Sequence, residues 1–279
     1  MVQEAEANRE IVPIFGEVRA ALGIDYSPLF LQTFAGYPKF LEMQWRAMKP
    51  LLATREFFEI AARLRAEAYT HVHNYFKVTT LGEGLARSEA APMLDVFSDV
   101  ETAALLLLSV QLQAFESVVG QKALTHPADQ RRLGATAFED AETAPAPVRR
   151  ILEDMRLALE LPFCTDEQRA LALWPELLFA YWRDLKPALQ SIFYENAISQ
   201  IRESAWLAAE EIPVLVDLEY DRLQENGVTP DEIASVTRLT DMLARAAAAT
   251  LLNATFAKIG LEGGNREVLV NRDKEERVA

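Results

Sequence analysis

Residues 38–52, PKFLEMQWRAMKPLL, and residues 175–189, PELLFAYWRDLKPAL, decide how this chain folds. In both segments apolar residues recur at intervals of three and four, which is the period of an amphipathic α-helix. Both begin with a proline, which suits the first helical turn, and both carry a Trp-Arg pair and a Lys-Pro pair at matching positions. The two segments match at a constant offset in residue number, from 45 to 182 at the tryptophans, so the sequence predicts two copies of one helical unit.

The same offset, called the repeat offset below, extends in both directions from these helices. Further matching pairs are Ile14 and Ile151, Arg19 and Arg156, Leu22 and Leu159, Leu52 and Leu189, Arg65 and Arg202, and Ala68 and Ala205. Farther on, the offset lengthens slightly and Gly120 meets Gly260. We therefore expect an all-α fold without a β-sheet, in which two tandem helical repeats pack about a pseudo-twofold axis and enclose a cleft.

Prolines, glycines and weak periodicity set the expected boundaries along the chain. We expect the first helical repeat at residues 1–124, a connector at 125–147, the second repeat at 148–260 and a polar tail at 261–279. The two repeats are expected to form one compact unit.

Composition excludes several functional classes. The net charge of −14 opposes binding to nucleic acid, because the field of the protein repels phosphate. No apolar run approaches the roughly 18 residues that cross a bilayer, and the acidic amino terminus does not resemble a signal peptide, so a cytoplasmic protein without a membrane partner is expected. The single cysteine, Cys164, excludes an internal disulfide. Whether two chains form a homodimer is left open.

The two repeats differ most at the turn that precedes the paired helices. At the repeat offset Asp166 matches Leu29, and Thr165 matches Pro28. The structural interpretation is that Thr165 and Gln168 form a capping box and that Asp166 complements the helix dipole. The functional interpretation is that Asp166 lines the cleft as a carboxylate, which could deprotonate a water or attack carbon itself.

Other polar candidates are weaker. His71 and His73 are two residues apart on a predicted helix and diverge, so they do not predict a metal site. The stretch from Gly82 to Gly84 lacks the lysine of a phosphate-binding loop. Gln111 is an amide in an apolar helix and matches Leu251 at the offset that joins Gly120 to Gly260, so it is an asymmetric position.

Residues 11–23, the Tyr37-Pro38 and Trp174-Pro175 pairs with the helices after them, and the turn at 161–166 resemble the group I 2-haloacid dehalogenases. The resemblance covers most of the chain and implies the duplicated all-α architecture. It also implies hydrolytic dehalogenation of a small 2-halocarboxylic acid without metal or organic cofactor.

The resemblance implies that Asp166 activates the water that displaces halide, without a covalent ester, and that Thr165 stands beside it as a small hydroxyl residue. The pocket wall it implies is Leu29, Leu31 and Phe34. It also implies an asparagine that holds the water, where this chain has a glutamine, Gln111.

Two alternatives remain. A homologue could keep this fold and use the cleft for binding or for other small-molecule chemistry, which the change from asparagine to glutamine would favour. A more distant resemblance to alkyl hydroperoxidase D-like proteins implies a reactive cysteine pair, and one cysteine argues against that chemistry.

Overall fold

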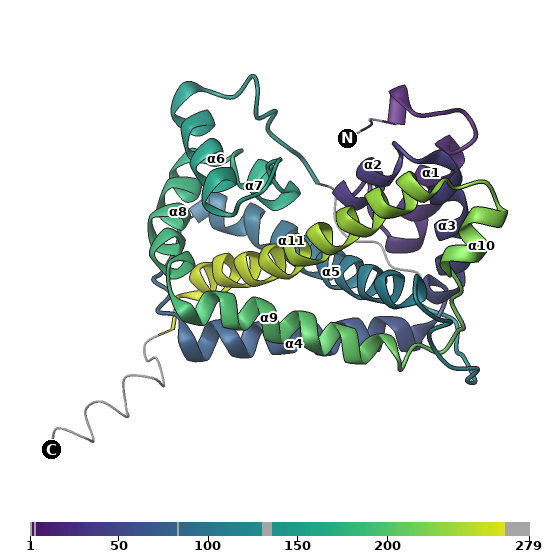
Figure 1. Cartoon of the computed structure of the whole chain (residues 1–279). Coiled ribbons are helices and arrows are strands. Elements are labelled where there is room, and N and C mark those ends of the chain that lie inside the picture. The colour runs from purple at the N-terminus through teal and green to yellow at the C-terminus, as the bar shows by residue number, and fades with distance from the viewer. Residues whose placement is uncertain (1, 3, 83, 130–135, 266–279) are drawn as a thin grey trace, which may run out of the picture. The chain divides into compact units, whose positions relative to one another are not determined.

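The computed structural model describes residues 2, 4–82, 84–129 and 136–265. Within these ranges the regular elements are all helices, as the apolar periodicity predicted (Figure 1). In chain order they are η1 (Glu4–Glu6), α1 (Val12–Leu22), α2 (Leu29–Phe34), α3 (Pro38–Leu52), α4 (Arg55–Tyr75), α5 (Gly84–Ala114), α6 (Ala146–Ala158), α7 (Asp166–Leu171), α8 (Pro175–Leu189), α9 (Ile192–Ala209), α10 (Tyr220–Glu225) and α11 (Pro230–Glu262). Among the described residues, no helix is both long enough and apolar enough to cross a bilayer.

The repeat offset reappears in the bounds of the helices. Shifting α2 and α3 by this offset gives the observed bounds of α7 and α8. Helices α3 and α8 each begin at a proline, whose missing N–H leaves no unpaired donor in the first turn. The pseudo-twofold axis expected between the repeats stays a prediction.

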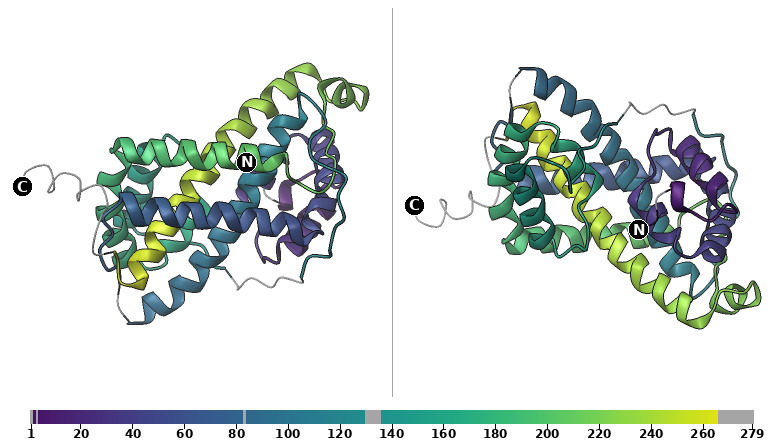
Figure 2. Two further views of the ribbon diagram at one scale, coloured as in Figure 1. Left: turned by 90° about the horizontal axis from the view of Figure 1, so that it is seen from below. Right: turned by 90° about the horizontal axis from the view of Figure 1, so that it is seen from above.

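The chain divides into two compact units that do not follow the predicted repeat boundaries. The first unit takes Met1–Leu64, Asp99–Ala135 and Arg202–Ala248, and the second takes Arg65–Ser98, Thr136–Ile201 and Ala249–Ala279. Four of the five boundaries fall inside the four longest helices, α4, α5, α9 and α11, and the fifth falls between residues 135 and 136. The right view of Figure 2 shows α11 as one unbroken helix. Each unit therefore draws on both halves of the sequence, while the division into repeats at 1–124 and 148–260 stays a prediction.

In the first unit, α1 and α2 both pack against α3. The aromatic core includes Phe34 and Phe40, whose ring centroids lie 5.4 Å apart, and Phe115, 6.0 Å from Phe40. Phe34 of α2 and Phe40 of α3 are fully buried, and the burial of Phe40 is consistent with the apolar stripe that predicted α3.

In the second unit, α6 and α7 both pack against α8. Tyr181 of α8 is one of the largest fully buried side chains, and its ring centroid lies 6.5 Å from that of Phe256. Tyr181 is therefore a polar side chain in the interior of this unit, where its hydroxyl needs a partner.

One tryptophan in each unit makes the same contact with a carboxylate and a lysine. Trp45 donates its indole N–H to Glu17 at 2.6 Å, and Trp182 donates to Asp154 at 2.7 Å. The lysine four residues after each tryptophan donates to the same carboxylate. The two acids also match at the repeat offset, so the contact among tryptophan, acid and lysine recurs in both units.

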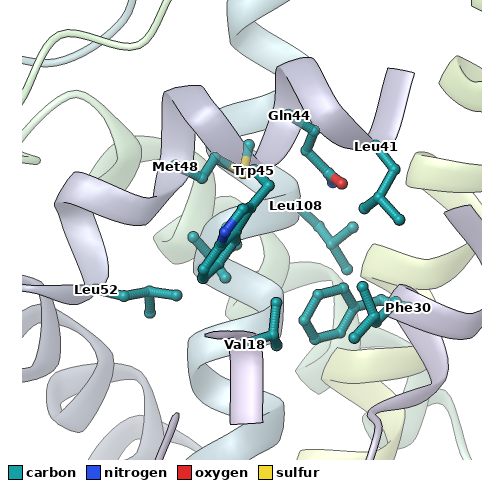
Figure 3. A pocket seen from close by; sticks show the side chains of 10 residues that line it. Val18, Phe30, Leu41, Gln44, Trp45, Met48, Leu52 and Leu108 are labelled. Atoms are coloured by element: carbon teal, nitrogen blue, oxygen red, sulfur yellow. The ribbon is translucent and has the colours of Figure 1, made fainter. Parts of the chain in front are cut away.

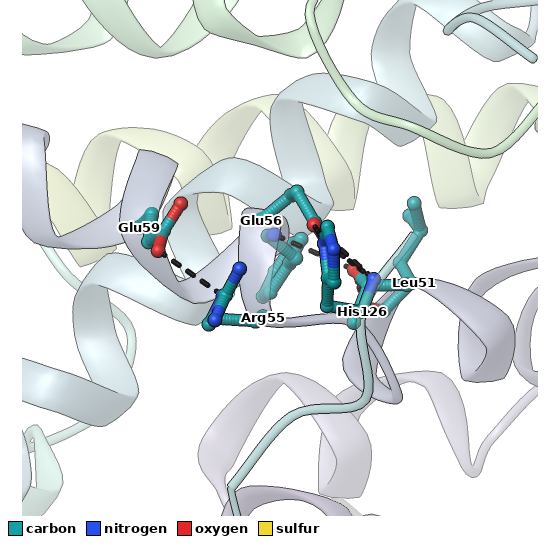
Figure 4. A network of polar contacts seen from close by, with 7 residues as sticks. Leu51, Arg55, Glu56, Glu59 and His126 are labelled. Atoms are coloured by element: carbon teal, nitrogen blue, oxygen red, sulfur yellow. Dashed lines mark hydrogen bonds and ion pairs between the residues drawn. The ribbon is translucent and has the colours of Figure 1, made fainter. Parts of the chain in front are cut away.

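The start of the connector is attached to the beginning of α4 (Figure 4). Glu56 accepts hydrogen bonds from the backbone N–H of His126 and lies 2.6 Å from its ring Nδ1. The backbone N–H of Arg55 donates to the carbonyl of His126, and the N–H of Ala128 donates to Ala53, both at 2.9 Å. These contacts pair residues 126–128 with the turn before α4.

Candidate active site

The site begins at the turn that enters α7 in the second unit. Thr165 is the N-cap residue in an extended conformation, and Gln168 is the third helical residue. The side-chain oxygen of Gln168 accepts a hydrogen bond from the backbone N–H of Thr165 at 3.2 Å. The two residues form the capping box that the sequence predicted, and this box holds the first turn of the helix in place.

Four successive polar side chains are buried at this turn. Thr165, Asp166, Glu167 and Gln168 are each 3 % exposed or less. Burying polar groups costs free energy unless each finds a partner, and burying a carboxylate costs most. Asp166 is a first-turn acid of α7, as the structural interpretation has it, and it is also buried, so its carboxylate needs a partner.

The matching helix of the first unit is apolar at most of the same positions. At the repeat offset its residues Leu29, Phe30 and Leu31 match the three polar residues that begin α7. A helix with the same bounds relative to the offset therefore forms without these buried polar groups. The first three polar side chains of α7 are not required by the fold.

Asp166 has a cationic neighbour. The guanidinium Nη1 of Arg169 lies 3.5 Å from a carboxylate oxygen of Asp166. The guanidinium also lies over the ring of Phe138, with 5.1 Å between its carbon and the ring centroid. Because Arg169 is about one-third exposed, the pair joins a buried carboxylate to a partly solvated cation.

Glu167 is the residue that the sequence reasoning missed. Its side chain has no exposed surface, and it accepts hydrogen bonds from the hydroxyl of Tyr181 at 2.6 Å and of Thr165 at 3.3 Å. Burial raises the pKa of Glu167 to about 7, although both hydrogen bonds act to lower it. Burial also raises the pKa of Tyr181 well above its usual value, so this phenol remains a donor.

Gln168 contributes a further polar atom to this interior. Its oxygen is used in the capping box, whereas its Nε2 has no hydrogen-bond partner in the part of the chain that the structure describes. A buried amide N–H without an acceptor is uncommon in a folded protein. It gives the turn a donor that a bound molecule or a water could satisfy.

Gln111 belongs to the first unit, and both the oxygen and the nitrogen of its side-chain amide form hydrogen bonds. Its oxygen accepts a hydrogen bond from Gln44 of α3, and its nitrogen donates to the hydroxyl of Thr240 of α11. Thr240 in turn donates to the carbonyl of Val236 at 2.6 Å. An amide nitrogen carries two N–H donors, and the contacts among described residues use one of them.

The predicted pocket wall also lies in the first unit. Leu31 and Phe34 are buried, and Leu29 is partly exposed. Leu31 lines a cavity of about 20 Å³, shown in Figure 3, whose walls include Gln44 and Trp45. Leu29 and Phe34 do not line this cavity, which has room for roughly one water and none for a substrate.

The structure thus brings together two of the predicted site residues, Thr165 and Asp166, in the second unit. Gln111 and the three apolar residues belong to the first unit. Among the described residues, no three His, Cys, Asp or Glu side chains are grouped as a metal site would require.

These features define a class of all-α proteins. In this class the helices recur at one offset, and the second set carries a buried acidic turn. A family model described as halocarboxylic acid dehydrogenase DehI matches residues 25–168, just over half of the chain. The chain belongs to this family. The matched range includes the whole capping box.

Three curated relatives are similar over most of their length. An (R)-2-haloacid dehalogenase of Rhizobium sp. (strain NHG3) is 22 % identical, covering 76 % of this chain and 87 % of the relative. An (R)-2-haloacid dehalogenase of Pseudomonas putida is 20 % identical, covering 92 % and 91 %. A configuration-inverting 2-haloacid dehalogenase of Pseudomonas sp. (strain 113) is 24 % identical, covering 88 % and 85 %.

Solved structures agree with the fold. A D-2-haloacid dehalogenase in complex with L-LA superimposes with a TM-score of 0.86 at 19 % identity, covering 93 % of this chain and 95 % of that one. A mutant with D-2-CPA gives the same TM-score and identity, covering 93 % and 94 %. The all-α fold is therefore shared with these enzymes.

Proposed function

We propose that the protein is a hydrolase that releases halide from small 2-halocarboxylic acids. Membership of the family and the names of all three relatives support this reaction class. The observation that carries the proposal is Asp166, a buried carboxylate beside Arg169 on a turn whose counterpart in the first unit is apolar.

In the proposed mechanism Asp166 acts as a general base. Its carboxylate takes a proton from a water, the water oxygen attacks the α-carbon, and the carbon–halogen bond breaks as halide leaves with the bonding electrons. Attack opposite the leaving group inverts the configuration, and no ester with the enzyme forms. A buried site suits this displacement, because fixed groups replace solvent around the reacting atoms.

The remaining site residues take supporting roles in the proposal. Thr165 and Gln111 position the water or the substrate, the latter through the amide N–H that Thr240 does not use. Leu29, Leu31 and Phe34 form the apolar wall. No metal or organic cofactor takes part, the substrate is a small anion, and the cytoplasm is the expected location.

The alternative is a homologue that binds a small molecule in this fold without turnover. The observation that favours it is Gln111, whose amide oxygen and nitrogen are both bonded to side chains of its own unit. A glutamine committed to Gln44 and Thr240 is less available to hold a reacting water.

Halide release from the separate enantiomers of 2-chloropropionate tests the proposal. We expect release from the parent and loss of at least about 10³-fold in kcat for Asp166→Asn, because the amide cannot accept the proton. Asp231→Asn is the matched control, since Asp231 is also a first-turn acid but is exposed, and it should retain parental activity. Activity that survives in Asp166→Asn would remove Asp166 as the base, and no release from the parent would favour the binding homologue.

A further inference from the structure

Comparison of α7 with the matching helix α2 identifies a second carboxyl group in the polar turn, that of Glu167. Glu167 occupies the position that Phe30 takes in the first unit, and its partner Tyr181 occupies the position of Gln44. Phe30 and Gln44 line the small apolar cavity and do not form such a pair. The matching helix forms with a phenylalanine at this position, so folding does not require an acid there. The buried acid in α7 therefore needs a functional explanation.

The contacts of Glu167 connect it to the residue before the proposed base. One carboxylate oxygen accepts from Tyr181 of α8, and the other accepts from Thr165, the N-cap of the helix that begins with Asp166. An ionised carboxyl is only an acceptor, so it can satisfy both hydroxyl donors at once. A protonated carboxyl has a hydrogen on one oxygen and competes with one of these donors.

We propose that Glu167 is a positioning residue for the reaction of Asp166: held by Tyr181, its carboxylate binds the Thr165 hydroxyl and fixes the turn from which Asp166 projects. This inference rests on the proposed function. Glu167 acts through Thr165 and does not touch the substrate. Its ionised form is the productive one, because that form accepts from both hydroxyls without a proton of its own that competes with them.

The surroundings of Glu167 shift its pKa into a range in which enzyme activity can be measured. The raised pKa, about 7, results from burial, so the residue changes charge near neutral pH. The titratable group in contact with Glu167 is Tyr181 on α8, which interacts with Tyr194. On α7 itself, Asp166 precedes Glu167 and Arg169 follows two residues later, and these two form an ion pair with each other. Activity should therefore fall on the acid side as Glu167 gains a proton.

The first test is the pH profile of kcat and KM for 2-chloropropionate in Glu167→Gln. Glutamine keeps the shape but turns one acceptor into a donor, so one of the two hydroxyls loses its partner. We expect kcat to fall by about 10- to 100-fold at pH 8, with KM changing less than about twofold, and the acid limb near pH 7 to disappear. Glu176→Gln, an exposed first-turn acid of α8, is the matched control and should leave the profile unchanged.

Tyr181→Phe is the second variant, and it removes one hydroxyl from the interior. Because the Tyr181 hydrogen bond lowers the pKa of Glu167, its loss should move the acid limb to higher pH. A purely structural role predicts a lower yield of folded protein with the limb unmoved. If the enzyme is active and the acid limb of the pH profile is the same in both variants as in the parent, the inference is overturned. The proposed function is not affected by that result.

A measurement without turnover separates the two proposals. The methyl resonance of Thr165, in protein labelled at threonine methyl groups, should shift with pH around neutrality in the parent and in Glu176→Gln. It should not shift in Glu167→Gln. If the parent releases no halide, the proposed function fails. The pH-dependent shift of the Thr165 methyl resonance then tests the contact between Glu167 and Thr165 by itself. If the parent shows no such shift, the inference is overturned as well.

Discussion

At the scale of single residues, some members of the candidate site could be predicted from the sequence and one could not. Asp166 and Thr165 could be selected because they break the match between the repeats. Glu167 breaks it equally, but an acid in the first turn of a helix usually faces solvent and complements the dipole. Its burial depends on α8 packing over α7, which periodicity does not show, although the mismatch with Phe30 was visible.

Glu167 should also leave a signature in the stability of the protein. Its folded pKa is about 7 and its ordinary value is 4.5, so between these values the folded state binds more protons than the unfolded state. The stabilisation from the protonated acid is complete below pH 4.5 and is lost as the pH rises through 7. The free energy of unfolding of the parent relative to Glu167→Gln should fall by about 3 kcal/mol from pH 4.5 to pH 8.

Urea unfolding of the parent, Glu167→Gln and Glu176→Gln across this range measures the effect. Glu176→Gln should follow the parent, because Glu176 is exposed. A constant difference between parent and Glu167→Gln would mean that Glu167 keeps an ordinary pKa in the folded protein.

At the scale of elements, the two helices that carry the repeat were predicted with their observed bounds, whereas the shortest helices give no periodic signal. Helices α3 and α8 have the predicted bounds, 38–52 and 175–189, because prolines fix their starts and apolar stripes run through them. Helices α2, α7 and α10 have six residues each, which is too short for a periodic signal. Gly120 and Gly260 match in the sequence, but Gly120 lies beyond α5, which ends at Ala114, whereas Gly260 lies inside α11.

Gly120 provides a prediction about the segment after α5. Its φ of +95° is left-handed, and a Cβ there would lie 2.3 Å from the carbonyl oxygen of Val214. Gly120→Ala should therefore destabilise the protein by about 2 kcal/mol or more. Gly16→Ala is the control, because Gly16 lies inside α1 with no neighbouring atom closer than 4.0 Å, and alanine there should stabilise by about 0.5–1 kcal/mol. Thermal unfolding compares the two; equal effects would contradict the role of backbone conformation.

The attachment of the connector gives a second prediction at this scale. Glu56 has its pKa lowered to about 2, first by the side chain of His126, so it is ionised at neutral pH. Glu56→Gln should weaken the pairing of residues 126–128 with the turn before α4, and the amide of Ala128 should exchange its hydrogen faster. Glu59→Gln removes only the exposed pair with Arg55 and should leave that exchange unchanged. Equal exchange in both variants would show that the backbone bonds hold the segment without Glu56.

At the scale of the whole molecule, composition and periodicity predicted the fold class but not the compact units. The units depend on contacts between segments far apart in the chain, and four of the five boundaries fall inside helices that are continuous in the chain. The all-α class, by contrast, follows from the apolar period alone and agrees with solved structures similar to this chain.

The net charge of −14 makes a prediction about salt. The excess of 42 acidic over 28 basic groups destabilises the folded state by repulsion, whereas exposed ion pairs contribute little. The melting temperature should therefore rise between about 10 and 150 mM NaCl at pH 8, as the screening length falls to about 8 Å. Near the isoelectric point of about 4.8 the rise should vanish. A fall in melting temperature with salt at pH 8 would show that ion pairs outweigh the repulsion.

The carboxylate-bound tryptophans make the two units separately visible to fluorescence. Of the four tryptophans, Trp45 and Trp206 belong to the first unit, and Trp174 and Trp182 belong to the second. Replacing either pair with phenylalanine leaves an emission signal from one unit alone. Overlaying the denaturation curves of the two double variants then reports whether the chain melts as one cooperative body or in two stages.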